Sequence, residues 1–174
     1  KLTTIGANVF QGCGLKSITI PTSVTTIGNE AFNSCQQLQT VTIPAATTSI
    51  GAQAFLFCGK LKEINVDKAN ATYASSDGIL LNHARTHLMQ FPAGKAESDF
   101  YTMLPPTITQ INDSAFYYNT NLRTVTIPRN VESIGRYTFA LCPNLEQVNL
   151  LGNSVTADAT AFHDMEQQTR IGEI

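Results

Sequence analysis

Four cysteines are the residues of this 174-residue chain with the clearest capacity for chemistry, and their spacing is regular. Cys13, Cys35 and Cys58 follow one another at intervals of 22 and 23 residues, and Asn119 and Cys142 are again 23 apart. Four cysteines could form two disulfides in a secreted protein, and cysteine thiolates also bind zinc. The chemistry therefore depends on how the fold places this column of residues.

The regular spacing of the cysteines argues against both kinds of bridge. Equivalent side chains of stacked repeats lie at about the strand spacing of 4.7–4.9 Å or further apart, whereas a disulfide needs Cβ atoms about 3.5–4.5 Å apart. Ligands stacked in a line do not form the tetrahedron that zinc requires. We expect buried, reduced thiols at sites that suit a small, partly polar residue. A Cys13–Cys35 or Cys35–Cys58 disulfide is the alternative.

Histidine and serine offer weaker candidates for a catalytic or metal site. His83 and His87 are four residues apart, and Asp77 or Asp99 could join them. That spacing has a geometric meaning only on a helix, and here it falls across a predicted turn. No GxSxG motif is present, and strand propensity explains the abundance of Ser and Thr. We expect no enzyme, no metal and no cofactor.

Composition excludes two further classes of function. The net charge is −2, the pI is near 5.9 and only 14% of residues are charged, so no basic field is available to hold nucleic acid. No apolar stretch reaches the length of a membrane span. We therefore expect no nucleic-acid partner and no membrane insertion in this segment.

The cysteine spacing belongs to a repeat of 23 residues that covers most of the chain. Only two irregularities interrupt it: one residue is missing after Cys13, and 61 residues separate Phe55 from Phe116. A fixed period of this length predicts a solenoid, in which each repeat packs only on its neighbours. Function must then be sought on a surface. The clearest copies are Ser17 to Leu38, Thr40 to Leu61 and Thr124 to Leu145.

Each repeat contains two patterns in a fixed order. Alternating apolar residues in Thr40 to Pro44 predict a short strand that ends at proline, which has no amide hydrogen to continue a ladder. An Ile-Gly pair follows, and then a segment such as Asn29 to Phe32, for which we predict one helical or 3₁₀ turn, with Gly28 free to adopt an unusual backbone angle. The Ile-Pro or Leu-Pro corner recurs at Ile20-Pro21, Ile43-Pro44, Leu104-Pro105 and Ile127-Pro128.

Residues 67–104 depart from the repeat. Two apolar runs around a polar turn predict a β-hairpin with strands near Ile79 to Asn82 and Thr86 to Phe91. Phe91-Pro92 resembles the strand-to-proline corner, so we expect His87 to Phe91 to join the parallel sheet and Gly78 to Asn82 to add an antiparallel strand. The insertion is either an enlarged coil that keeps the array in register, which we favour, or a ligand-binding loop.

The combined motifs resemble one known family. The pattern LxxLxL, joined to IP, IG, AF and C, is similar to the BspA-like (Treponema pallidum type) leucine-rich repeats of host-associated bacterial surface proteins. LxxLxL stands at Leu15-x-x-Ile18-x-Ile20, Leu38-x-x-Val41-x-Ile43, Leu61-x-x-Ile64-x-Val66, Leu122-x-x-Val125-x-Ile127 and Leu145-x-x-Val148-x-Leu150.

This resemblance implies a fold and a setting. The fold is an α/β solenoid, a right-handed coil with a parallel β-sheet on the concave side and short helical turns on the convex side, in one unit over residues 1–174. The setting is extracellular or at the cell surface. The first residues, Lys1 to Gly6, fall in the middle of a repeat, at the position equivalent to Thr25 to Gly28. We therefore expect the chain to be a segment of a longer protein.

The resemblance also implies adhesion, with host matrix proteins such as fibronectin or fibrinogen, or a surface glycan, as partners and no catalytic residues in the repeat. The candidate binding surface is the outward face of the strands, which is polar and nearly uncharged and suits hydrogen bonding to a partner. Its residues form two rows: Ser17, Thr40, Glu63, Thr124 and Gln147, and Thr19, Thr42, Asn65, Met103, Thr126 and Asn149.

Thr also suits any solvent-facing strand, so the same rows are compatible with a structural spacer that binds nothing and displays another domain. A spacer should present a monotonous face, whereas a binding face should vary between repeats. Glu63, Asp67 and Met103 interrupt the threonine rows near the insertion. This variation favours binding.

Overall fold

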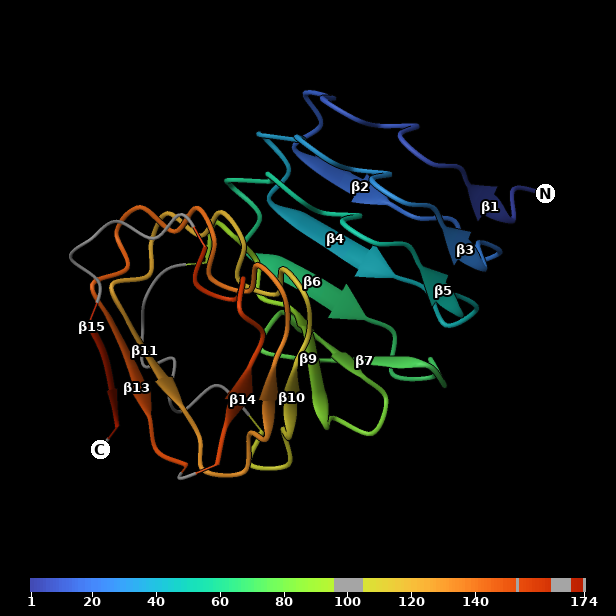
Figure 1. The fold of residues 1–174 in the computed structure, drawn as a ribbon. Coiled ribbons are helices and arrows are strands. Elements are labelled where there is room, and N and C mark those ends of the chain that lie inside the picture. The colour runs from blue at the N-terminus through green and yellow to red at the C-terminus, as the bar shows by residue number, and fades with distance from the viewer. Residues whose placement is uncertain (96–104, 153, 164–169, 174) are drawn as a thin grey trace.

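The computed structural model describes residues 1–95, 105–152, 154–163 and 170–173. The described chain winds into successive coils, and the two termini lie at opposite ends of the stack (Figure 1). Each regular coil contains two short strands separated by turns, and equivalent strands of neighbouring coils pair in parallel. The predicted solenoid is confirmed.

The LxxLxL segments form the first set of strands, as predicted. Together with a strand at Arg170–Glu173, which has no LxxLxL pattern, they make two separate three-stranded parallel sheets, and in the first of these Thr40 lies opposite Ser17 on one side and Glu63 on the other. The first sheet contains β2 (Ser17–Thr19), β4 (Thr40–Ile43) and β6 (Glu63–Val66), and the second contains β11 (Thr124–Ile127), β13 (Gln147–Leu150) and β15 (Arg170–Glu173).

The Ile-Gly segments, together with the equivalent segments that end at Ile111 and Ala157, form a second set of strands that was not predicted from the sequence; all six are called Ile-Gly strands below. Each is only two residues long, too short to show an alternating pattern. They are β1 (Thr4–Ile5), β3 (Thr26–Ile27) and β5 (Ser49–Ile50) in one sheet, and β10 (Gln110–Ile111), β12 (Ser133–Ile134) and β14 (Thr156–Ala157) in another.

The predicted helical turns are wrong, because the described residues contain no helix. In their place is a chain of tight turns with two residues at positive φ in the second coil, Glu30 at 54° and Ser34 at 61°. Such residues interrupt the right-handed conformation that a helix requires. Amides then alternate between two partners: Asn33 N–H donates to Glu30 C=O within the coil, and Phe32 N–H donates to Ala54 C=O of the next coil.

The glycine of each Ile-Gly pair has a different role from the one predicted. Among the described glycines only Gly12 and Gly78 have positive φ, so Gly28 and Gly51 are not needed for an unusual backbone angle. A Cβ on Gly51 would lie 2.4 Å from Asn29 N, and one on Gly28 would lie 2.5 Å from Ala7 N. Glycine is required because neighbouring coils approach closely here.

Phenylalanines stack through the core behind the turns. Phe32 lies between Phe10 and Phe55 with ring centroids 5.2 and 5.5 Å apart, and the rings are nearly parallel. A second ladder runs through the later coils, with spacings of 5.0 to 5.5 Å between Phe91, Phe116, Phe139 and Phe162. The predicted burial of Phe32, Phe55, Phe116 and Phe139 is confirmed, since each is 0–3% exposed.

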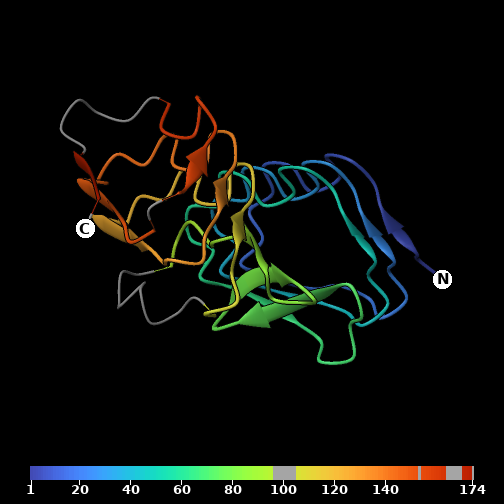
Figure 2. The ribbon, with the colours of Figure 1, turned by 60° about the horizontal axis from the view of Figure 1, so that its bottom comes forward.

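A hairpin lies between the earlier and the later coils (Figure 2). Strands β8 (Ile79–Asn82) and β9 (His87–Gln90) pair antiparallel, as predicted, and β9 pairs in parallel with β10. A further strand, β7 (Tyr73–Ser76), was not predicted and pairs antiparallel with β8. The hairpin thus extends the second Ile-Gly sheet to six strands.

The assignment of Phe91-Pro92 to the strand-to-proline corner is wrong. Leu88 pairs with Ile111, so β9 occupies the position of the Ile-Gly strand and not that of the LxxLxL strand. Phe91 consequently falls in the phenylalanine ladder, 5.0 Å from Phe116. A Phe-Pro pair alone does not distinguish the end of an LxxLxL strand from the position of a ladder phenylalanine, because both positions hold an apolar residue.

The phenylalanine ladder leads to a stability prediction. Phe32→Ala should lower the free energy of unfolding by about 3–5 kcal/mol, because it leaves a cavity between two stacked rings. Thr42→Ala, on the exposed side of β4, should change it by no more than about 0.5 kcal/mol. Urea denaturation followed by circular dichroism measures both. Equal losses in the two variants would contradict the assignment of faces.

Candidate functional site

The predicted binding rows lie on the outward sides of the LxxLxL strands. Their burial is uneven: Thr126 and Asn65 are half-buried and Asn149 is 9% exposed. Met103 lies outside the described residues. The exposed members are Ser17, Thr19, Thr40, Thr42, Glu63, Thr124 and Gln147.

Several row members hydrogen-bond to one another. Asn65 Nδ2 donates to Glu63 Oε2 at 3.0 Å, and Gln147 Nε2 donates to Asn149 Oδ1 at 2.7 Å. The side chains of Thr40 and Thr42 make no hydrogen bond to other described residues. The threonine side chains of β4 are therefore available to a partner without breaking an internal bond.

The structure places these rows on two sheets and not on one continuous face. β6 is an edge of the first sheet and β11 an edge of the second. The hairpin covers the β6 edge, where Ile64 N–H donates to Gly78 C=O at 2.8 Å and Val66 N–H to the Ser75 hydroxyl at 3.0 Å. The candidate surface is thus two polar faces, separated at the hairpin.

The cysteine column has a structural explanation. All four cysteines are free, and Cys35, Cys58 and Cys142 are buried as predicted, whereas Cys13 is only half-buried. Cys58 Sγ lies 3.1 Å from Phe32 O and Cys142 Sγ 3.1 Å from Phe116 O, so each thiol donates to the phenylalanine carbonyl of the preceding coil.

Asn119 fills the same column with a fuller set of bonds. Its Nδ2 donates to Pro92 C=O at 3.3 Å, and its Oδ1 accepts from the amides of Asn121 and Leu122. This explains why Cys and Asn can replace each other here: the site needs a small donor aimed at the preceding coil.

The buried cysteines are held as neutral thiols. Burial raises the pKa of the Cys58 thiol to about 12 and that of the Cys142 thiol to about 11, and it also raises the pKa of Cys35. Nucleophilic and metal-binding chemistry requires the thiolate. A raised pKa therefore disfavours a reactive role for these three residues at neutral pH.

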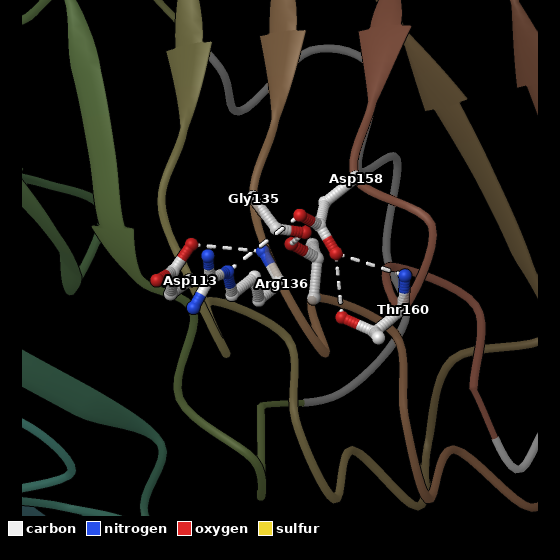
Figure 3. A network of polar contacts seen from close by, with 6 residues as sticks. Asp113, Gly135, Arg136, Asp158 and Thr160 are labelled. Carbon is white, nitrogen blue, oxygen red and sulfur yellow. Dashed lines mark hydrogen bonds and ion pairs between the residues drawn. The ribbon is translucent and has the colours of Figure 1, made fainter.

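Charged groups gather at the turns that follow the second Ile-Gly sheet (Figure 3). Arg136 lies between two acids: its backbone N–H donates to Asp113 Oδ1 at 2.8 Å, and its Nε is 3.6 Å from Asp158 Oδ2. Asp158 also accepts from the hydroxyl and the backbone amide of Thr160, and these bonds, with Arg136, lower the pKa of Asp158. The network ties successive coils together.

No group of three or more His, Cys, Asp or Glu suited to a metal occurs among the described residues. His83 Nδ1 is 2.9 Å from the Asn70 carbonyl, inside the insertion. His83 lies at the turn of the hairpin and His87 on β9, so the two do not share one face of a helix.

A cleft of about 540 Å³, which was not predicted from the sequence, lies where the hairpin interrupts the stack. Residues of the third coil, from Ile50 to Phe55, line one wall, and Met89, Gln90 and Asn112 are among those on the other. The only signal for it in the sequence was the 61-residue interval between Phe55 and Phe116, which places an interruption but does not say that it opens a cleft.

Comparison with known families matches the repeat directly. The BspA type leucine-rich repeat region is found in six copies, over residues 1–77 and 100–172. The chain belongs to the BspA-type leucine-rich repeat family. The predicted resemblance is confirmed.

Solved structures of bacterial leucine-rich repeat proteins share this fold. One, a leucine-rich repeat protein from Eubacterium ventriosum, has a TM-score of 0.70 and 25% identity over 86% of this chain and 45% of its own. The pneumococcal vaccine antigen PcpA has a TM-score of 0.70 and 24% identity over 88% of this chain and 44% of its own. A leucine rich cell surface protein from Faecalibacterium prausnitzii has a TM-score of 0.61 and 20% identity, over 98% and 63%.

The BspA-type chain spans less than half the length of the first two of these proteins. Among curated proteins none matches. Within the described ranges, no helix is long and apolar enough to cross a membrane.

The cysteine geometry predicts a pattern of chemical labelling. In the folded protein at pH 8, iodoacetamide should modify half-buried Cys13 first and leave Cys58 and Cys142 largely unmodified, because they are buried and remain protonated well above that pH. After denaturation without reductant all four should be labelled. Mass spectrometry of the digested protein gives the result, and recovery of a Cys13–Cys35 or Cys35–Cys58 linked peptide would contradict it.

Proposed function

We propose that this chain is a non-enzymatic interaction module of a bacterial cell-surface or secreted adhesin. It binds a host extracellular matrix protein such as fibronectin or fibrinogen, or a surface glycan, through the outward faces of the LxxLxL strands. The family supports the general class, because the repeats belong to bacterial leucine-rich repeat proteins. A surface location is supported by the structural neighbour described as a cell surface protein.

The observation that carries the proposal is the exposed threonine pair on β4. Thr40 and Thr42 point outward from a paired strand while Val41 and Ile43 between and after them are buried. Their hydroxyl groups can each donate and accept, and they make no internal hydrogen bond. Neighbouring Thr19 and Glu63 extend this face across the sheet, so a partner would meet a rigid, polar and weakly charged surface.

The spacer is the second candidate. A stacked array can display another domain with no ligand of its own, and the same polar faces would keep it hydrated. The chain spans only part of its structural neighbours, so a domain elsewhere in a longer protein could carry the activity.

A charge-insertion variant tests the strand faces. The variant Thr40→Lys, Thr42→Lys, Thr124→Lys and Thr126→Lys should lose binding to immobilised fibronectin, fibrinogen or arrayed glycans in interferometry, because long charged side chains would cover both faces. A matched control carries the same four added charges in loops away from the faces: Thr22→Lys, Ala45→Lys, Asn130→Lys and Ser154→Lys. Circular dichroism checks that both are folded.

The affinity of the wild type for its partner should depend only weakly on salt concentration. With few charges on the faces, affinity should change little as salt shortens the Debye length from about 10 Å to about 3 Å. Full binding by the folded face variant would place the site elsewhere. No binding by the wild type to any of the probes would favour the spacer.

A further inference from the structure

Backbone hydrogen bonds between coils follow one rule along the turns. The carbonyl of the Ile-Gly strand residue accepts from the next coil, as Ile27 C=O does from Gly51 N–H and Ile111 C=O from Gly135 N–H, both at 2.8 Å. Beyond it, alternate amides donate to the next coil. Glu30 N–H donates to Ala52 C=O, and Ser114 N–H donates to Arg136 C=O.

The third coil breaks this rule. Ile50 C=O receives no hydrogen bond from any described residue, and the amides of Gln53 and Phe55, which occupy the positions of Glu30 and Phe32, donate to none. Backbone amides in folded proteins nearly always have a partner, either another protein group or water. Four backbone groups, the carbonyl of Ile50 and the amides of Gln53, Phe55 and Phe57, therefore lack the partner coil that the fold supplies elsewhere, and the first three of them line the cleft.

These three groups belong to the segment from Ile50 to Phe55, which lines the cleft between the third coil and the hairpin. At one end of this segment the Tyr73 hydroxyl accepts from Ile50 N–H at 2.9 Å. Beyond the other end the coils meet again, where the Phe57 ring lies 5.0 Å from that of Tyr118. The open edge is thus bounded on both sides and faces a space within the about 300–1,000 Å³ range of ligand pockets.

The opposite wall carries an unpartnered acceptor. Asn112 occupies the position of Gly51 and Gly135, and its Oδ1 is buried without a hydrogen-bond partner. A Cβ at Gly51 or Gly135 would meet the preceding coil within 2.4 Å. Asn112 has room for a side chain because the turn of the preceding coil is shorter: Phe91 is three positions after Leu88, whereas Phe116 is five positions after Ile111.

We propose that this cleft binds an extended peptide segment of a partner protein, which pairs with the open edge from Ile50 to Phe55 by backbone hydrogen bonds. Addition of a strand to an exposed edge is a general mode of peptide recognition. In an extended polypeptide, the carbonyls on one side recur at every second residue. The amides of Gln53 and Phe55 are also two residues apart, so successive carbonyls of a peptide could accept from both. One peptide N–H would satisfy Ile50 C=O, and a polar peptide side chain could reach Asn112 Oδ1.

This site is independent of the strand faces proposed for adhesion. It uses main-chain groups at the turns, whereas the adhesive faces use side chains of β4 and its neighbours. The expected selectivity is accordingly for small residues that let the peptide backbone approach, and against glycans, which cannot present the same alternation of donors and acceptors.

Hydrogen exchange of the free protein tests the open edge first. By NMR, the Gln53 amide should exchange faster than the Glu30 amide at the equivalent position, because only Glu30 is hydrogen-bonded between coils. Equal protection of the two in the free protein would overturn the proposal. Protection of Gln53 that grows with protein concentration would also overturn it, since a second copy of this chain would then occupy the edge.

Panning of random linear peptides displayed on phage supplies the probes. Selected synthetic peptides should bind the wild type, slow exchange at Gln53 and Phe55, and bind Ala52→Trp at least about tenfold more weakly, because the indole fills the cleft. Ala7→Trp, at the same turn position of the first coil, is the matched control and should bind like the wild type. Circular dichroism confirms that both variants are folded.

The remaining outcomes are decisive as well. Three results would each refute a peptide site. The selected peptides could bind Ala52→Trp as tightly as the wild type, or the panning could select no peptide. In the third, Ala52→Trp but not Ala7→Trp would lose binding to oligosaccharides. The four-lysine face variant should retain peptide binding, so failure of the adhesive proposal and failure of this one give different results.

Discussion

The hydrogen bond from one coil to the next is the interaction on which the rest of this structure depends. No single coil buries enough apolar surface to be stable, and the turns contain residues such as Glu30 and Ser34 in a backbone conformation that side chains disfavour. Inter-coil bonds along the strands and turns fix that conformation in register. Register in turn places Phe32 over Phe10 and under Phe55, so the core follows from the backbone pairing.

The hairpin changes the array from one core to two. Strand β8 is buried on both sides: Ile79 and Leu81 belong to the core of the later coils, whereas Leu80 packs into the core of the earlier ones. This accounts for its unbroken apolar run. The insertion therefore joins two solenoid segments through a shared strand. It covers the edge of β6 but leaves the turn edge from Ile50 to Phe55 open.

The sequence predicted the features that repetition makes visible, and it failed where geometry depends on tertiary pairing. The period, the LxxLxL strands, the buried phenylalanines and the β8–β9 hairpin were all predicted from spacing and alternation. The helical turns were wrong because the run from Asn29 to Phe32 has no local feature that excludes a helix; the positive φ of Glu30 depends on hydrogen bonds between neighbouring coils. Phe91 was misplaced for a related reason, since the pairing of Leu88 with Ile111 decides its position. The candidate rows were recognisable as outward residues, but their division between two sheets was not, because it follows from the path of the hairpin.

The two surfaces differ in how their specificity could evolve. On the strand faces, an exposed residue such as Thr42 can be exchanged with little effect on the fold, so each repeat can present different side chains on the same backbone. At the cleft, recognition depends on main-chain groups that do not change with sequence, and on the hairpin that keeps them uncovered. Deleting the hairpin would restore a continuous stack and remove the open edge together with the room for Asn112. Variation in side chains therefore tunes the first surface, whereas the presence of an insertion creates or abolishes the second.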